Sequence, residues 1–388
     1  MNVMKMTGIP VSLLIPTIVL LGASCAGLMC CTGDESVPIG FAAQLTGVQA
    51  ELGVQERNGV QLAMEDINAS GGIAGRPAVL VVRDDLGTPE GARSAARDLV
   101  AAGVLAIIGH ATSELTIAGL TVTNPARVVM ISPTASAPEL GGKDDYFFRV
   151  SFNLVNRADA LARHVLLSRG ITRLAVVYNT DNTAYSKAYL EAFQATYQAL
   201  GGTLTAEVGF SSRVQPDFTP LVIGLRTENP GGLLMIAADN DTAMIAQRTR
   251  LMHWAVPLFA TAWSQTETLL HSGGQAVEGL ELEIATSPTG NSPGFLDFTR
   301  RYRERYGHPA SFGAALGYET AKMLATALQE TGARADGLKQ ALEGIRNFKG
   351  LNDTLSMDRY GDVVRPFHLG VVRNGKYDLV TSLKETKP

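Results

Sequence analysis

The fold is decided by VPIGFAA at residues 37–43, NGVQLAMEDINASGG at residues 58–72 and VLVV at residues 79–82. The first and third segments are short apolar runs, as expected of strands buried on both faces of a parallel sheet. Between them, apolar residues from Val60 to Ile67 recur at the spacing i, i+3, i+4, i+7, which predicts a helix. This strand–helix–strand order predicts a parallel sheet with its crossover helices packed on the sheet faces.

The same alternation continues outward from this stretch. Further strands are predicted at Val104–Ile108 and Val128–Ile131, and then, in a second series, at Leu174–Tyr178, Leu204–Val208, Leu233–Ile236 and Pro257–Phe259. The clearest later helices are Ala184–Leu200, Pro293–Tyr306 and Gly313–Glu330, and a hairpin turned at Asn374-Gly375 joins Phe367–Val372 to Tyr377–Val380. We therefore expect an α/β protein with two similar units, each a parallel sheet flanked by helices.

The composition of the chain excludes several classes of protein and predicts the number of domains. The 388 residues are 46% hydrophobic and 18% charged, which excludes a disordered chain. The 33 Lys and Arg residues against 37 Asp and Glu residues give a net charge of −4, which argues against a nucleic-acid partner. At roughly 150 residues per domain, the length predicts two domains, each with its own core.

Residues 1–35 have the character of a leader. The apolar run Ile9–Leu21 is shorter than the roughly 20 residues that span a bilayer, so it predicts a secretory signal and not a transmembrane helix. All three cysteines, Cys25, Cys30 and Cys31, follow it, so the folded body has no disulfide framework. Leu21-Gly22-Ala23-Ser24-Cys25 is similar to a bacterial lipobox and predicts lipidation of Cys25. Cys31 is a rival acceptor, and an ordinary cleaved signal is the alternative.

Signatures of catalysis and metal binding are missing. The sequence has no Walker A loop and no GxGxxG turn after the first strand, and its six histidines form no HxxxH pair. His110 and Ser113 are close in sequence, but neighbouring side chains of this kind rarely face each other as a base and a nucleophile must. We therefore expect a protein that is not an enzyme and that holds no metal and no cofactor.

Two hydroxyl-rich turns follow predicted strands and are the candidates for binding chemistry. They are Thr112-Ser113 and Ser132-Pro133-Thr134-Ala135-Ser136. Ligands of open parallel sheets bind outside the carboxyl ends of the strands. A helix N-terminus at that edge offers unpaired N–H groups and the positive end of its dipole, which suits a carboxylate. The alternative is that Ser113 and Ser136 are only N-caps.

Several motifs, in order, resemble the leucine/isoleucine/valine-binding proteins, which are periplasmic solute receptors of ATP-driven importers. Those in the first unit are IGFAAQLTG (39–47), NGVQLAMEDINASGGIAGR (58–76), RDDLGTPEGARSAARDLV (83–100), IIGHATS (107–113) and ISPTASAPEL (131–140). The resemblance extends into the second unit through FFRV (147–150), AVVYNTDNTAYSKAYLEAF (175–193) and AVEGLE (276–281).

The resemblance implies two Rossmann-like lobes that are joined by three crossover segments and close on a ligand in the cleft between them. Lobe 1 would comprise residues 36–151 and 287–362, and lobe 2 residues 152–286 and 363–388, after a signal peptide and lipoprotein tether at 1–35. In this family the closed form docks on a membrane permease. Closure needs a ligand that touches both lobes, because only a ligand with higher affinity for the closed state shifts that equilibrium.

Residue by residue, the resemblance implies a carboxylate site on lobe 1. Ser113 matches the serine that binds the ligand carboxylate, and Ser136, next to Ala135, matches a residue that donates its hydroxyl and backbone N–H to the same group. Thr134 matches the position whose backbone carbonyl accepts a hydrogen bond from the ligand ammonium. Tyr185 aligns with the aromatic residue of lobe 2 that closes over the ligand.

At three positions the sequence departs from the family pattern, so the chemical class of the ligand is not determined by the resemblance. Leu52 stands where amino-acid binders often carry an aromatic residue, Asp239 lies near another aromatic position, and Trp263 stands about where an acidic residue pairs with the α-ammonium. A buried ammonium without that carboxylate is costly. Either Asp239 replaces the carboxylate, or Trp263 stacks on a carboxylate ligand without an α-amine, such as an aromatic acid. Core packing for Trp263 and a solvated helix cap for Asp239 are the structural alternatives.

The expected function is a non-catalytic receptor that binds a small carboxylate, with an amino acid favoured, and delivers it to an ABC permease in the inner membrane. A ligand-binding sensor module of the same fold is the alternative, and it would need a separate partner. The expected location is the periplasm, with membrane contact only through the lipid anchor.

Overall fold

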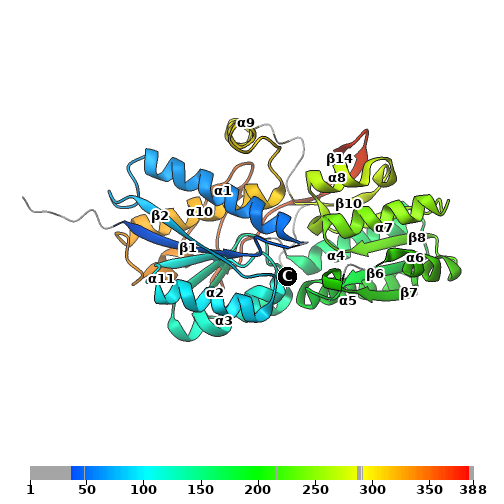
Figure 1. The fold of residues 1–388 in the computed structure, drawn as a ribbon, viewed down its shortest axis with the longest axis horizontal. Helices are drawn as coiled ribbons and strands as arrows, with labels where there is room; N and C mark the ends of the chain where they lie inside the picture. The colour runs from blue at the N-terminus through cyan, green and yellow to red at the C-terminus, as the bar shows by residue number, and fades with distance from the viewer. Residues whose placement is uncertain are drawn as a thin grey trace, which may run out of the picture. The chain divides into compact units, whose positions relative to one another are not determined.

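Two separate β-sheets organise the chain (Figure 1). The computed structural model describes residues 36–47, 49–151, 153–214, 217–285, 290 and 292–383. They fall within one unit, Glu35–Pro388. The predicted leader, with Cys25, Cys30 and Cys31, lies outside the described residues.

The first sheet has five parallel strands in the order β2-β1-β3-β4-β5 among the described residues. Their bounds are β1 Val37–Ala43, β2 Ala78–Asp84, β3 Ala106–Gly109, β4 Val129–Ser132 and β5 Phe147–Arg149. The helices packed with this sheet are α1 Ala50–Ala69, α2 Pro89–Ala101, α3 Ser113–Ala126, α10 Phe312–Glu330 and α11 Leu338–Glu343. We call the sheet and these helices, together with α9 (Pro293–Tyr306), lobe 1.

Alternate strand residues of lobe 1 face opposite layers of helices, because successive side chains of a strand point to opposite faces. Phe41 and Ile108 pack in a cluster with α1, α10 and α11, whereas Ala42 and Ile107 pack in a cluster with α2 and α3. Figure 1 shows these two layers on either side of the sheet. The predicted stripe from Val60 to Ile67 lies in the first of these clusters.

The second sheet has the strand order β14-β13-β10-β9-β8-β6-β7. Its bounds are β6 Arg173–Asn179, β7 Thr203–Phe210, β8 Gly232–Ile236, β9 Leu258–Ala260, β10 Glu281–Ile284, β13 Phe367–Arg373 and β14 Lys376–Leu383. Strands β6 to β10 are parallel, and the hairpin β13–β14 adds to β10 in antiparallel orientation. We call this sheet and its helices lobe 2; they are α4 Leu154–Arg163, α5 Thr183–Ala199, α6 Phe218–Thr227, α7 Asp239–Leu251 and α8 Glu267–Gly273.

The chain passes between the lobes three times in its described part: after β5, after β10 and before β13. A short antiparallel pair, β11 Phe348–Lys349 and β12 Thr354–Leu355, precedes the last passage. The α/β class with two Rossmann-like units is therefore confirmed. Helix α3 includes Pro125, and Arg127 in the left-handed conformation, with φ of 55°, ends it.

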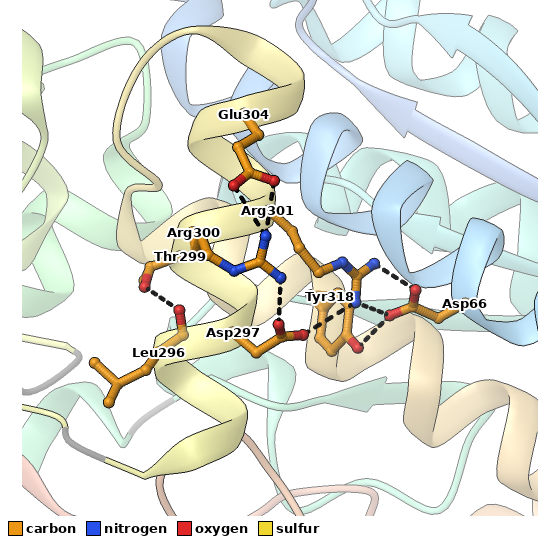
Figure 2. A network of polar contacts seen from close by, with 8 residues as sticks. All are labelled: Asp66, Leu296, Asp297, Thr299, Arg300, Arg301, Glu304 and Tyr318. Carbon is orange, nitrogen blue, oxygen red and sulfur yellow. Dashed lines mark hydrogen bonds and ion pairs between the residues drawn. The ribbon is translucent and has the colours of Figure 1, made fainter.

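Helix α9 follows the second passage and is fixed to lobe 1 by a polar network (Figure 2). The guanidinium of Arg301 forms a bidentate pair with the carboxylate of Asp66 on α1. The hydroxyl of Tyr318 on α10 donates to the same carboxylate at 2.7 Å. Bidentate Arg–carboxylate pairs are geometrically specific, so this network fixes α9 against two helices of lobe 1.

Candidate functional site

A cavity lies between the lobes, beyond the carboxyl ends of parallel strands from both sheets. Its volume is about 30 Å³, which is room for roughly two water molecules. The lining residues are Leu52, Ala111, Thr112, Ser113, Thr134, Ser136, Phe312 and Leu316 of lobe 1, Arg157, Asn182, Tyr185, Ala262 and Trp263 of lobe 2, and Ser151 and Ala285 next to the crossings.

The structure brings together most of the residues predicted to bind a ligand. Six of them line this one cavity: Leu52, Ser113, Thr134, Ser136, Tyr185 and Trp263. Ala135 and Asp239 are not among the lining residues. The roles of these residues toward a ligand stay predictions.

The two predicted serine turns contact each other directly. The Oγ atom of Ser113, at the start of α3, accepts hydrogen bonds from the backbone N–H groups of Ser136 and Ala137, both at 3.1 Å. The alternative that both serines are only N-caps is wrong, because the N-cap of α3 is Thr112 and Ser113 Oγ binds the other turn. Because the Ser113 oxygen accepts both bonds, its hydroxyl hydrogen is available to donate to a ligand.

Thr134 connects the cavity to a buried acid of lobe 1. Its hydroxyl lies 2.6 Å from the carbonyl oxygen of Ala111 and 2.5 Å from Oε1 of Glu56. A hydroxyl has one hydrogen, so Thr134 can donate fully to only one of these two oxygens. Both contacts are satisfied when Glu56 is a neutral carboxylic acid that donates to Thr134, so the geometry favours the neutral form. Burial raises the pKa of Glu56 to about 8, in agreement with this geometry.

Arg157 brings a buried cation from lobe 2 to the cavity. Its side chain is 5% exposed, and its Nη2 donates to Ser136 Oγ of lobe 1 at 3.1 Å. Its Nη1 lies 3.4 Å from Oε2 of Glu283 on β10. Burial raises the pKa of Glu283, and the neighbouring guanidinium opposes that shift.

Two aromatic residues form the wall of lobe 2. The rings of Tyr185 and Trp263 meet edge to face, with centroids 5.6 Å apart. Trp263 packs against a hydrophobic cluster made mostly of lobe 1 residues and against a hydrophobic cluster of lobe 2. It therefore contributes to the cavity wall and to the packing between the lobes.

Asp239 begins α7 outside the cavity and is 5% exposed. Its Oδ2 accepts from the hydroxyl of Thr266 at 2.6 Å, and its Oδ1 accepts from the N–H of Asn240 at 2.8 Å. Burial raises its pKa to about 6. The interpretation of Asp239 as a solvated helix cap is wrong, because the carboxylate is buried and hydrogen-bonded.

The lobes also contact each other around the cavity. Gln49 of lobe 1 donates to Ser212 Oγ of lobe 2 at 2.8 Å, and Arg213 of lobe 2 donates to the carbonyl of Gly87 in lobe 1. Helix α3 contacts helix α5. The lobes are therefore together in this structure.

Sequence reasoning missed three charged or polar residues of the cavity, Arg157, Asn182 and Ser151. A signal for Arg157 is present, because it follows Leu154 by three positions and precedes Leu161 by four, which places it on the buried face of α4. For Asn182 we find no such signal, because its role depends on which helix of lobe 1 lies opposite.

No helix within the described ranges is both long and apolar enough to cross a membrane. Over the same ranges, no three His, Cys, Asp or Glu side chains gather where they could bind a metal ion.

Comparisons with known proteins agree with this architecture. The family model described as "Periplasmic binding protein" matches residues 36–376. The Leu/Ile/Val-binding protein BraC3 of Rhizobium johnstonii is 34% identical over 203 residues, about half of each chain (50% of this one and 52% of that one). The Leu/Ile/Val-binding protein homolog 3 of Brucella melitensis is 28% identical over 340 residues, 85% of this chain and 89% of that protein.

A solved structure shows the same fold over almost its whole length. The leucine-binding protein LivK of Thermotoga maritima superposes with a TM-score of 0.83 at 25% identity, covering 90% of this chain and 99% of that chain. The family model spans well over half of the chain and includes both lobes. The chain therefore belongs to the periplasmic binding protein family, whose members bind solutes outside the cytoplasm.

Proposed function

We propose that this chain binds a small carboxylate-bearing solute between its lobes and delivers it to an ABC permease in the inner membrane. One observation carries the proposal: the start of α3 at Thr112 and Ser113, the start of α5 at Asn182, and the guanidinium of Arg157 all line one cavity. Helix N-termini and a guanidinium all favour negative charge. The relatives named for binding leucine, isoleucine and valine support the same solute size and head group.

Binding works through lobe closure in this proposal. The cavity of about 30 Å³ admits a solute of several heavy atoms only after the lobes separate. Ser113 and Ser136 on lobe 1 and Arg157 on lobe 2 then hold the carboxylate, and Tyr185 and Trp263 cover the rest of the solute. Because the solute touches both lobes, its binding free energy favours the closed state.

Titration calorimetry and thermal unfolding of the exported chain test the proposal. The probes are L-leucine, L-phenylalanine, 4-methylpentanoate, 3-phenylpropanoate and benzoate, each with its primary amide as a control for the carboxylate. We expect at least one acid to bind at least tenfold more tightly than its amide. Saturation at a hundred times Kd adds about 2.7 kcal/mol to the free energy of unfolding. The proposal fails if no acid binds or if the amides bind equally well.

Acylation of Cys25, which tethers the receptor to a bacterial membrane, is a separate part of the proposal and is supported by the sequence Leu21-Gly22-Ala23-Ser24-Cys25. Mass spectrometry of the N-terminal peptide from membranes tests it. We expect a diacylglyceryl group on Cys25, and Cys25→Ala should release the protein while Cys31→Ala should not. The reverse result would assign the anchor to Cys31.

A further inference from the structure

The charged side chains around the cavity distinguish carboxylate solutes that carry an α-ammonium group from those that do not. Arg157 is the only residue with an ionised side chain among the described residues that line the cavity. Its guanidinium lies between the lobes and contacts Ser136 Oγ of lobe 1 at 3.1 Å. A solute carboxylate that reaches Ser136 therefore also reaches a cation, and charge-assisted hydrogen bonds are roughly twice as strong as neutral ones.

Glu283, the buried carboxylate that pairs with Arg157, offers no site for a cation in the cavity. It is fully buried and is not a lining residue. The hydroxyl of Tyr189 donates to its Oε1, and the N–H of Ala262 and the guanidinium of Arg157 approach its Oε2 at 3.3 and 3.4 Å. Both oxygens are therefore engaged by groups of the protein.

The other acids of lobe 2 near the interlobe surface are also engaged. Asp239 accepts from Thr266, and Asp241 accepts from Ser212 at 2.5 Å. The carbonyl of Thr134, which the family resemblance assigns to the ligand ammonium, accepts from Ser151 Oγ at 3.0 Å and carries no net charge to balance an ammonium. An α-ammonium group in the cavity would thus meet a guanidinium and the positive end of α3, with no carboxylate among the described lining residues. The Glu114 carboxylate of lobe 1 is engaged as the cap of α5.

We infer that the solute is a carboxylate without an α-ammonium group, and that Arg157 is the residue that selects it over an α-amino acid. The carboxylate lies against Arg157, Ser136 and the start of α3, and the apolar body of the solute packs against Tyr185, Trp263 and Phe312. This inference rests on the proposed function and names the solute class of that same site.

Matched pairs of solutes test the inference in the unmodified protein. L-leucine is compared with 4-methylpentanoate, and L-phenylalanine with 3-phenylpropanoate, so that each pair differs only in the ammonium group. We expect the deaminated acid of at least one pair to bind at least tenfold more tightly. If the amino acids bind more tightly, the inference is overturned and the proposed function stands. If no carboxylate of the panel binds, the proposed function itself fails and the inference falls with it.

Variants of Arg157 test whether this residue causes the preference for the acid without an ammonium group. Arg157→Gln should weaken binding of the deaminated acid at least tenfold and reduce its preference over the amino acid, whereas Arg157→Lys should retain the preference. The matched control is Arg163→Gln on the same helix, whose side chain is 53% exposed and pairs with Asp159. An unchanged preference in Arg157→Gln would show that Arg157 does not select the solute. If Arg157→Gln does not fold, the Lys variant and the solute pairs decide.

Discussion

The carboxylate of Glu114, on lobe 1, accepts a hydrogen bond from the backbone N–H of Ala184, on lobe 2, at 3.1 Å. The hydroxyl of Thr183 donates to the same oxygen at 3.1 Å, and the N–H of Glu114 donates in return to the side chain of Asn182 at 3.1 Å. The N-cap residues Thr112 and Asn182 make no cap bond within their own helices, α3 and α5. Each helix start is therefore capped by the opposite lobe, so these bonds require the two lobes to be together.

Glu114→Ala removes the side-chain half of this reciprocal cap, the bonds from Thr183 and Ala184, without altering a residue that lines the cavity. A lost N-cap costs about 1 kcal/mol, so we expect the solute to bind about fivefold more weakly. Because the contact forms on closure, the dissociation rate should rise while the association rate stays within about twofold. Stopped-flow binding measures both rates. Glu191→Gln, an exposed change on α5, is the control, and equal dissociation rates in the two variants would contradict the role.

Ser113 and Ser136 should respond differently to alanine, although both are proposed carboxylate contacts. Ser113→Ala leaves the N–H groups of Ser136 and Ala137 without their acceptor, so it should lower the free energy of unfolding by about 1–3 kcal/mol as well as the affinity. Ser136→Ala should lower mainly the affinity. Urea unfolding and calorimetry separate the two effects, and the double variant should lose at least about 2 kcal/mol of binding free energy. An affinity retained in the double variant would place the carboxylate elsewhere.

Trp263 should report closure by its fluorescence, because it packs against clusters of both lobes and against the ring of Tyr185. The chain has one other tryptophan, Trp254, so the Trp254→Phe variant isolates the signal. We expect the emission of Trp263 to shift on addition of a bound acid, with a midpoint equal to the calorimetric Kd. If the emission stays constant up to saturation, Trp263 neither contacts the solute nor changes its environment when the lobes close.

The sequence alone was sufficient to predict the α/β class and most strands, because segments such as Val37–Ala43 are apolar throughout and turn signals follow the helices. The hydroxyl turns were also predictable, since they directly follow strands whose ends share one edge of the sheet. Ser113 and Ser136 needed no long-range information to be recognised as candidates. Their mutual hydrogen bonds could not be predicted, because they depend on how the two turns pack.

Strand β10 and its glutamates show what local patterns miss. Glu281 and Glu283 are poor strand residues, and the sequence predicted no strand at Glu281–Ile284. The structure pairs Glu281 with His164 and Arg169, and Glu283 with Tyr189 and Arg157. Each pairing joins residues more than ninety positions apart, so no local pattern indicates it.

The same reason explains why the reciprocal cap between the lobes was missed. Asn182 and Glu114 are ordinary residues of two helix starts when each is considered within its own segment. Their role appears only when α3 and α5 face each other, which is a property of how the lobes close. Local chemistry was thus predictable from the sequence, whereas the partners across the cleft required the structure.

The neutral state of Glu56 leads to a pH dependence of stability. Burial raises its pKa from 4.5 to about 8, the Thr134 contact lowers it in part, and Asp85 raises it further. Between these pH values the folded chain holds one more proton than the unfolded chain. The contribution of Glu56 to the free energy of unfolding is therefore fully present below pH 4.5. It decreases by about 1.4 kcal/mol per pH unit as the pH rises toward 8.

Glu56→Gln keeps a neutral donor next to Thr134 and removes the ionisation. We expect its advantage in unfolding free energy over the unmodified chain to grow by about 3 kcal/mol between pH 5.5 and pH 8, measured by urea unfolding at both values. Glu65→Gln on the same helix, where the side chain is 39% exposed, is the control and should show no such growth. Parallel stability curves for Glu56→Gln and the unmodified chain would mean that Glu56 is ionised in the fold. The Thr134 hydroxyl would then have to donate to the Glu56 carboxylate, and it could not donate to the Ala111 carbonyl at the same time.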